Sequence, residues 1–377
     1  MDTGNPVAAA DTGFVTDATL PARLDALRRM AATGGRRLAV ERIGASRDGR
    51  DLWALEIGDG PEPVGITAGA HADEPTGPIA AFALAGWLLT AREAGPLLAC
   101  HTFRICPQVN PDGAARNASW FSDPVDPLAY LRGVARELPG DDVEFGYPDP
   151  AAEAGGGDDP GVRPENRAVA AFLARTRGYA FHASLHSMAT AEGAWFLIGR
   201  EWAGRTAPLR TTLAGHAARL GFALHDVERH GEKAFTRIAP GFCTTPRSDA
   251  MRAHFLAEGD PAMAARFRLN SMEFVQRLGG DPLVMVSEIP LFEIAGAAGR
   301  PDPPPAGATA HDRLRAELPG ARRALLEGDD APARRLVEEH RFRPVAVRPH
   351  VELQVRMVLE ALAFLAARGP GAAAPTA

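Results

Sequence analysis

The amino-acid sequence predicts an α/β protein whose doubly wound, mixed but largely parallel sheet carries helices on both faces. Short apolar runs of strand length alternate with helical segments along the chain, which is the pattern of a parallel sheet covered on both sides. The chain has 377 residues, of which 46% are hydrophobic and 23% charged, so it is long and apolar enough to bury a substantial core. A globular protein is therefore expected.

The first elements lead up to a histidine. Apolar residues recur at helical spacing over residues 20–30 and predict a helix. Two strand-like runs, residues 38–46 and 51–58, flank a polar turn that contains glycine, which predicts a hairpin. The short apolar run at residues 64–71 then predicts a buried strand that ends at His71.

Later elements continue the alternation of helices and strands. We expect an Ala-rich helix over about 75–92, a strand over 100–109, a long loop over 118–164, a helix over 165–175, and strands over 181–188 and 283–290. The loop is rich in Asp, Pro and Gly, and loops of this length in compact domains are commonly functional or mobile.

A single catalytic domain over residues 20–368 is the simplest organisation. The Pro-rich run at 301–305 begins a polar, arginine-rich segment, which we interpret as an insertion at about 299–342. The last helix places an apolar stripe on one face and needs a core to cover, so it should pack back on the same sheet. Residues 1–19 and 369–377 are expected to be flexible.

Charge and cysteine content exclude several classes of function. A net charge of -6 argues against an extended surface for nucleic acid. Three cysteines without CxxC spacing indicate neither a disulfide framework nor a thiolate zinc site. The N-terminus does not resemble a secretory signal, and no run approaches the roughly 18 apolar residues of a membrane span. We expect a cytoplasmic protein that uses neither nucleic acid nor membrane as a partner.

His71 and Glu74 form an HxxE unit at the carboxyl end of a predicted strand, where open α/β sheets place their ligand sites. A separation of three residues on a turn brings an imidazole and a carboxylate to the same side, and both are zinc ligands. A catalytic zinc usually has three protein ligands, and His186 at the end of its own predicted strand is the best third candidate. His182, near the other end of that strand, is interpreted as a hydrogen-bonded core histidine.

Five motifs occur in the order found in zinc carboxypeptidases of the carboxypeptidase A type, which the chain resembles. These motifs are GITAGAHADEPTG, PQVNPDG, RPENRAVAAFL, LHSM and VSEIP. The hairpin RIGASRDGRDLWALEIG is similar to the opening hairpin of that family, and the likeness extends from about residue 37 to 293. The resemblance implies one zinc ion held by His71, Glu74 and His186.

The resemblance also implies catalytic residues. Glu288 matches the family's catalytic glutamate and would serve as the general base, with Glu293 as the rival candidate. Arg116, which follows NPDG in an Arg-Asn context with Asn117, matches the arginine that stabilises the oxyanion. Asn117 is accordingly included among the substrate-binding candidates.

The chain departs from the family where the substrate's carboxylate is normally held. The family carries Asp-x-Asn-Arg, whereas this sequence has Glu144 and Phe145 at the positions of Asn and Arg. A carboxylate such as Glu144 repels another carboxylate, so one hypothesis is that Glu144 attracts a cationic group of the substrate. The alternative is that the alignment of the loop is wrong, and that Arg163 or Arg167 binds the carboxylate.

The sequence thus favours a zinc-dependent hydrolase that cleaves a peptide or amide bond with activated water. A second possibility is an N-acyl amino acid deacylase that resembles aspartoacylase or succinylglutamate desuccinylase. A third, from a different class, is an inactive binding protein on the same fold. The substrate is expected to be a peptide or small amide, and the oligomeric state is left open.

Overall fold

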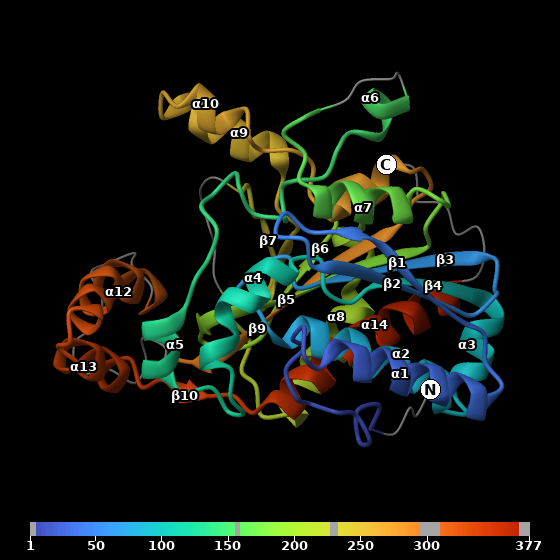
Figure 1. Cartoon of the computed structure of the whole chain (residues 1–377), viewed down its shortest axis with the longest axis horizontal. Coiled ribbons are helices and arrows are strands. Elements are labelled where there is room, and N and C mark those ends of the chain that lie inside the picture. The colour runs from blue at the N-terminus through green and yellow to red at the C-terminus, as the bar shows by residue number, and fades with distance from the viewer. Residues whose placement is uncertain (1–4, 155–158, 227–232, 295–309, 369–377) are drawn as a thin grey trace.

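A ten-stranded sheet runs through the centre of the computed structural model, which describes residues 5–154, 159–226, 233–294 and 310–368 (Figure 1). The strand order is β1-β2-β4-β3-β5-β9-β6-β8-β7, with β10 pairing to β9. The strands are β1 (Leu38–Ala45), β2 (Asp51–Ile57), β3 (Glu62–Ala68), β4 (His101–Cys106), β5 (Phe181–Ala191), β6 (Trp195–Ile198), β7 (Arg237–Ala239), β8 (Phe242–Thr244), β9 (Leu283–Glu293) and β10 (Arg343–Pro344).

The centre of the sheet is parallel and its flanks are mixed. Strands β4, β3, β5 and β9 pair in parallel, whereas β1 and β2 form an antiparallel hairpin that joins β4. On the other side β6 pairs with β9 antiparallel and with β8 in parallel. The predicted mixed, largely parallel sheet is confirmed. Its parallel centre brings the carboxyl ends of β3 and β5 to the same edge.

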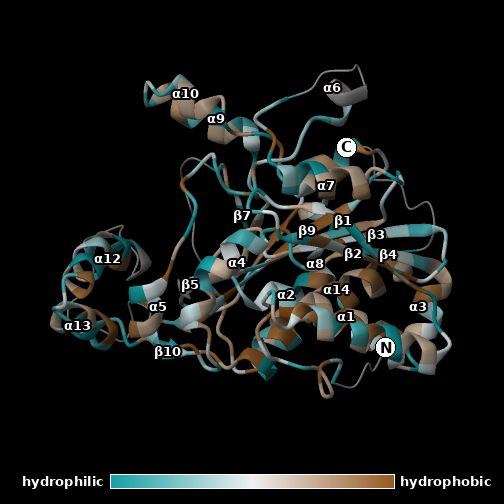
Figure 2. Cartoon of the chain, in the orientation of Figure 1, coloured by the Kyte–Doolittle hydropathy of each residue, from teal (hydrophilic) through white to brown (hydrophobic). Residues whose placement is uncertain are grey.

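One face of the sheet is covered by the main hydrophobic core. The helices on this side are α1 (Leu20–Gly34), α2 (Thr76–Thr90), α3 (Ala94–Cys100), α8 (Ala207–Arg219) and α14 (Val347–Arg368). Helix α2 is apolar on nearly all sides and is buried, because α1 and α14 pack against it while it lies on β5. Figure 2 shows hydrophobic residues gathered on these helices and on the central strands. The last helix, α14, packs on β5 and β9 of this sheet, as the sequence predicts.

The opposite face carries a smaller core around α7 (Pro164–Leu173) and α11 (Ser271–Arg277), with α9 (Ser248–Ala257) and α10 (Pro261–Ala264) beyond it (Figure 1). The segment predicted as a long loop is partly helical. It contains η1 (Ala118–Trp120), α5 (Pro127–Gly133) and α6 (Pro150–Ala154), and α4 (Pro111–Asn117) precedes it. Helix α5 forms because Asp126 caps its N-terminus by accepting from the amide of Ala129 at 2.6 Å.

The predicted insertion contains two helices, α12 (Ala310–Leu326) and α13 (Ala331–Glu339), which pack on each other and on α5. Residues 295–309, which open that segment, lie outside the described part of the chain. Residues 5–19 differ from the flexible N-terminus that the sequence suggested, since Val7 and Val15 are buried and Arg348 donates to the Val7 carbonyl at 2.6 Å. Residues 1–4 and 369–377 are likewise not described.

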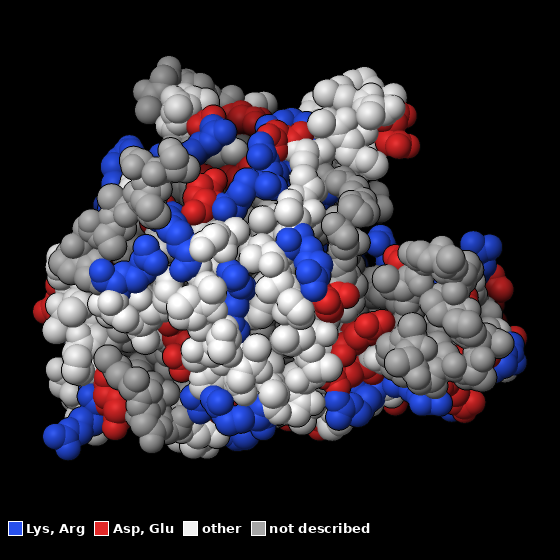
Figure 3. Space-filling view, turned by 180° about the vertical axis from the view of Figure 1, so that it is seen from behind, with Lys and Arg blue, Asp and Glu red and all other residues white. Residues whose placement is uncertain are grey.

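The surface has no single-sign charged face in the view of Figure 3, where basic side chains form separate groups among uncharged and acidic ones. Cys100 and Cys106 are free cysteines. None of the helices in the described ranges is both long enough and apolar enough to cross a membrane.

Candidate metal centre

The first two candidate ligands follow the carboxyl end of β3. The chain turns at Gly69, whose φ is +71° and where an added Cβ would lie 2.2 Å from the Gln108 side chain, so only glycine fits. The amide of Glu74 then donates to the carbonyl of His71 at 3.3 Å, which closes a short turn before α2 begins. Both side chains are buried, and His71 Nδ1 lies 2.7 Å from Glu74 Oε1.

His186 lies in the middle of β5, which corrects the expectation that it ends a strand. The strand continues to Ala191 because β9 pairs with it along its whole length. In this register His186 is opposite Glu288, and Glu288 is opposite Trp195 of β6 on its other side. Since paired residues of neighbouring strands point to the same face, the register sets the Glu288 side chain beside that of His186.

Donor atoms of His71, Glu74 and His186 converge within 4.8 Å of one another. His186 Nδ1 lies 2.8 Å from Glu74 Oε2 and 3.1 Å from His71 Nδ1. Nitrogen ligands of a tetrahedral zinc at about 2.0–2.1 Å are roughly 3.4 Å apart, so the two imidazoles are spaced much as a bound ion requires. The Ser187 amide also donates to Glu74 Oε2 at 3.2 Å and fixes the carboxylate.

The electrostatics of this cluster favour a positive charge at its centre. Burial raises the pKa of Glu74, but the charges of His71 and His186 outweigh it and hold that pKa well below its usual value. Burial lowers the pKa of His186, yet Glu144 and Glu74 reverse this and leave it well above its usual value. The donor set therefore fits a divalent cation, with two neutral imidazoles and one carboxylate as ligands.

Glu288 is positioned to move a proton next to the cluster. Burial, together with the charge of Glu74, raises the pKa of Glu288 to about 8, although His186 opposes the shift. A carboxyl group with a pKa near neutrality can both accept and return a proton, as a general acid/base must. Glu293, the rival candidate, is at the far end of β9 and forms an ion pair with Arg343.

Glu144 also lies at the cluster. Its Oε2 is 3.1 Å from His186 Nε2, and its side chain is only 5% exposed. The same Nε2 is 2.8 Å from Ser184 Oγ, so this ring nitrogen faces two oxygens. Because Nδ1 faces Glu74 and Nε2 faces Glu144, the imidazole is held in the orientation that presents Nδ1 to a metal.

Phe145 is a core residue rather than an open surface for substrate. It is 2% exposed and its ring packs against Phe267 at 5.7 Å between centroids. Lys233, the only lysine in the sequence, has its Nζ 5.9 Å from the centre of the Phe145 ring. The positive charge of Lys233 favours the ionised forms of both Glu144 and Glu288, although other groups affect the pKa of each more strongly.

Arg116 and Asn117 lie on α4 and have other partners. The Arg116 guanidinium pairs with Glu137 at 2.5 Å and its side chain is 46% exposed. Asn117 is fully buried, donates to the carbonyls of Gly113 and Ala135, and accepts from the Trp120 indole and the Ala135 amide. In the described structure neither residue contacts the three candidate ligands.

Arg136 is the arginine that reaches the cluster, and the sequence analysis missed it. Its Nη1 lies 3.3 Å from Glu74 Oε1 and 3.1 Å from Asp73 Oδ1, while 41% of its side chain is exposed. The Tyr130 hydroxyl donates to Asp73 Oδ2 at 3.0 Å and holds the carboxylate that orients Arg136. The available signal was that Arg136 is the nearest arginine before the Asp142–Phe145 segment.

The remaining candidates have structural partners. His182 is fully buried with Nε2 3.2 Å from Ser271 Oγ, which agrees with the core role expected for it, and burial lowers its pKa to about 4. Arg163 pairs with Glu165 at 2.9 Å and donates to the Asp141 carbonyl at 2.7 Å. Arg167 donates to the Asp159 carbonyl at 2.9 Å.

Comparison with known proteins adds a match to a family model over part of the chain. A model described as zinc carboxypeptidase matches residues 24–193. This part of the chain matches the zinc carboxypeptidase family. The resemblance inferred from the order of the motifs is thereby confirmed over these residues. The matched residues include His71, Glu74 and His186 but end before Glu288. A search of curated proteins found no match.

Three solved structures are similar to the chain at low sequence identity. Carboxypeptidase A from Helicoverpa armigera is 12% identical, with 95% of this chain and 75% of that chain covered and a TM-score of 0.50. Bovine thrombin-activatable fibrinolysis inhibitor, solved with tick carboxypeptidase inhibitor, is 14% identical, with 95% and 99% covered and a TM-score of 0.47. A metallo-carboxypeptidase from Burkholderia cenocepacia is 16% identical, with 92% and 68% covered and a TM-score of 0.45. At 12% identity the likeness to the Helicoverpa armigera structure concerns the fold alone.

Proposed function

We propose that the protein is a zinc-dependent hydrolase of peptide or amide bonds. The observation that carries this proposal is the convergence of His71, Glu74 and His186 next to Glu288, a carboxyl group whose pKa is raised to about 8. Zinc at such a site supplies a Lewis acid that polarises a carbonyl and lowers the pKa of water to about 7 in favourable cases.

The chain's own residues would carry out the proton transfers. Glu288 takes a proton from the attacking water at its carboxylate and returns it to the departing amine. Arg136 presents a partly exposed guanidinium beside Glu74, where it can stabilise the oxygen that becomes negative as the carbonyl is attacked. Asp73 holds Arg136 in that position through the contact at 3.1 Å.

We infer that Glu144 acts on His186 rather than on a substrate. Its carboxylate is 4% exposed and faces the ring nitrogen that points away from the ligand cluster. A buried carboxylate that pairs with the outer nitrogen of a ligand histidine fixes the ring and strengthens metal binding. This role differs from the hypothesis that Glu144 attracts a cationic substrate group, and the two can be separated by measurement.

Glu144→Gln is expected to weaken zinc binding about 10- to 100-fold, because the amide cannot match the carboxylate as a partner for the imidazole. Competition against a chromophoric chelator measures this change. Glu137→Gln is a matched control, since Glu137 has the same 5% exposure but pairs with Arg116. Unchanged zinc affinity together with a raised KM for amine-bearing substrates would instead support a substrate-binding role.

The test of the proposed function begins with metal-free protein. Calorimetric titration is expected to give one zinc per chain, and zinc at about 1,000 times its Kd should raise the free energy of unfolding by about 4 kcal/mol. His186→Ala should lose both effects, whereas His254→Ala on α9 should keep them. Equal zinc binding by the wild type and His186→Ala would rule out the proposed ligand set.

Hydrolysis is then measured with zinc-loaded protein on N-acyl dipeptides and N-acyl amino acids side by side. Faster release from the dipeptides is expected for a peptidase, and the reverse preference would favour the deacylase alternative. Addition of a chelator should abolish the activity and zinc should restore it. A protein that binds zinc as expected but cleaves neither substrate class would favour the inactive binding protein.

A further inference from the structure

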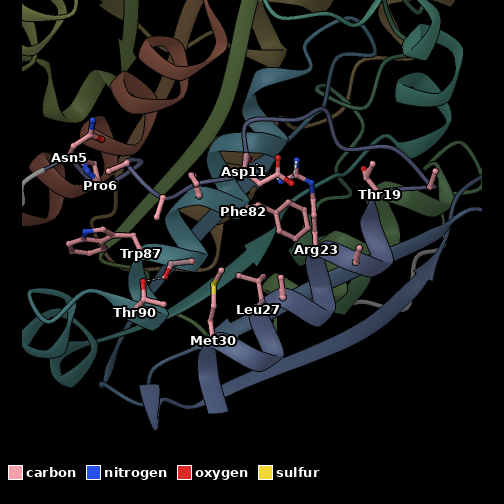
Figure 4. Close-up of a pocket in the computed structure, with 18 residues that line it drawn as sticks. Asn5, Pro6, Asp11, Thr19, Arg23, Leu27, Met30, Phe82, Trp87 and Thr90 are labelled. Atoms are coloured by element: carbon pink, nitrogen blue, oxygen red, sulfur yellow. Dashed lines mark hydrogen bonds and ion pairs between the residues drawn. The ribbon is translucent and has the colours of Figure 1, made fainter. Parts of the chain in front are cut away.

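A groove of about 620 Å³ lies between the N-terminal segment and helices α1 and α2 (Figure 4). It is lined by residues from 5–11, from 18–30 and from 82–90, so it contains none of the residues of the metal centre. Its volume lies within the roughly 300–1,000 Å³ of sites that hold small molecules. The groove is thus a candidate site separate from the proposed active site.

The walls of the groove are mostly apolar, and small residues in the walls leave space for a ligand. Leu27, Met30, Phe82 and Trp87 provide the large apolar surfaces, and alanines supply much of the rest. At Gly86 an added Cβ would meet only Met30 Sδ, at 3.6 Å, so that part of the wall is open. An exposed apolar concavity of this kind is typical of a ligand-binding surface.

One buried cation lies on this apolar surface. Arg23 is 7% exposed and is the only basic residue of the lining. Its two terminal nitrogens contact the carbonyls of Asp11 and Gly13, and Nη2 is 3.2 Å from Asp11 Oδ2. Its buried Nε has no hydrogen-bond partner. The Asp11 side chain is 72% exposed, so solvent screens its charge and Arg23 is incompletely neutralised.

We propose that the groove binds a fatty-acid-like carboxylate, with the alkyl chain along the apolar walls and the carboxylate at Arg23. Guanidinium groups bind carboxylates through charge-assisted hydrogen bonds, and the free Nε offers one more donor for that purpose. Asp11 at the same end opposes a doubly charged head group, which favours a carboxylate over a phosphate monoester. A groove of about 620 Å³ with mostly apolar lining has more room than a compact acid fills, which favours an alkyl chain.

Calorimetry with decanoate and with 1-decanol, on both zinc-loaded and chelator-treated protein, tests the proposal. Decanoate is expected to bind once per chain with the same affinity in both forms, because none of the residues that line the groove is a proposed metal ligand. Decanoate should bind at least about tenfold more tightly than the alcohol, which lacks the charge that Arg23 recognises. Binding that disappears with the metal would assign decanoate to the proposed active site and overturn the inference.

Two variants separate the head-group contact from the groove itself. Arg23→Met should weaken decanoate binding about tenfold or more and leave 1-decanol unchanged, while Arg29→Met on the exposed side of α1 should match the wild type. Ala26→Leu keeps Arg23 and places a larger side chain in the groove. Leucine is a good helix former, so α1 should be preserved while the binding of both decanoate and 1-decanol is weakened. The proposal would be overturned if the wild type showed no saturable binding. It would also be overturned if a folded Arg23→Met variant lost affinity for decanoate and for 1-decanol equally.

Discussion

Glu288→Gln is expected to lower kcat by about 10²- to 10⁴-fold while the protein still binds one zinc. Glutamine keeps the size of the side chain but cannot accept a proton, so the attacking water loses its base. The pKa of Glu288 is raised to about 8 by burial and by the charge of Glu74, and the neutral amide should therefore be tolerated in this environment. The measurement is kcat with the N-acyl dipeptide that the wild type cleaves fastest, alongside metal analysis.

Glu293→Gln on the same strand is the matched control. Glu293 is equally part of β9 but pairs with Arg343 at the far end, so its removal should change stability more than kcat. Circular dichroism and the melting temperature show whether each variant is folded. If Glu293→Gln loses activity and Glu288→Gln keeps it, the base has been assigned to the wrong glutamate.

Much of the fold follows from local sequence patterns. The hairpin of β1 and β2 is specified by two alternating runs around one polar turn, and α2 by an apolar run too long for a strand. His71 and Glu74 could be paired from sequence because three residues of separation fix their geometry locally. The extent of β5 could not be predicted from its own sequence, because it depends on pairing with β9 about a hundred residues later.

The parts of the candidate site that the sequence analysis missed depend on contacts between distant segments. Arg136 reaches Glu74 in a part of the structure where Tyr130 and Asp73, 57 residues apart, form a hydrogen bond. Glu144 was expected to face the substrate, and its contact with His186 depends on how the same loop folds over β5. Spacing along the chain carries no information about such contacts, whereas it carries a great deal about helices and turns.

Arg136→Gln is expected to lower kcat by about 10²- to 10³-fold, the usual effect of removing one donor to an oxyanion. Its guanidinium is the one that the structure brings to Glu74, at 3.3 Å, while enough of it is exposed to meet a substrate. Because the charge acts mainly as the carbonyl oxygen becomes negative, kcat should fall much more than KM rises. Steady-state kinetics of the zinc-loaded variant measure both constants.

Arg116→Gln tests the assignment that the sequence alone suggested. Arg116 is 46% exposed and contacts none of the candidate ligands, so its loss should change kcat by no more than about twofold. Stability should fall, because Glu137 is only 5% exposed and would lose its cationic partner. A large loss of kcat in Arg116→Gln with near-normal activity in Arg136→Gln would reverse the two roles. Loss in both would indicate that Glu137, which lies next to Arg136 in the chain and binds Arg116 in space, couples the two guanidinium groups.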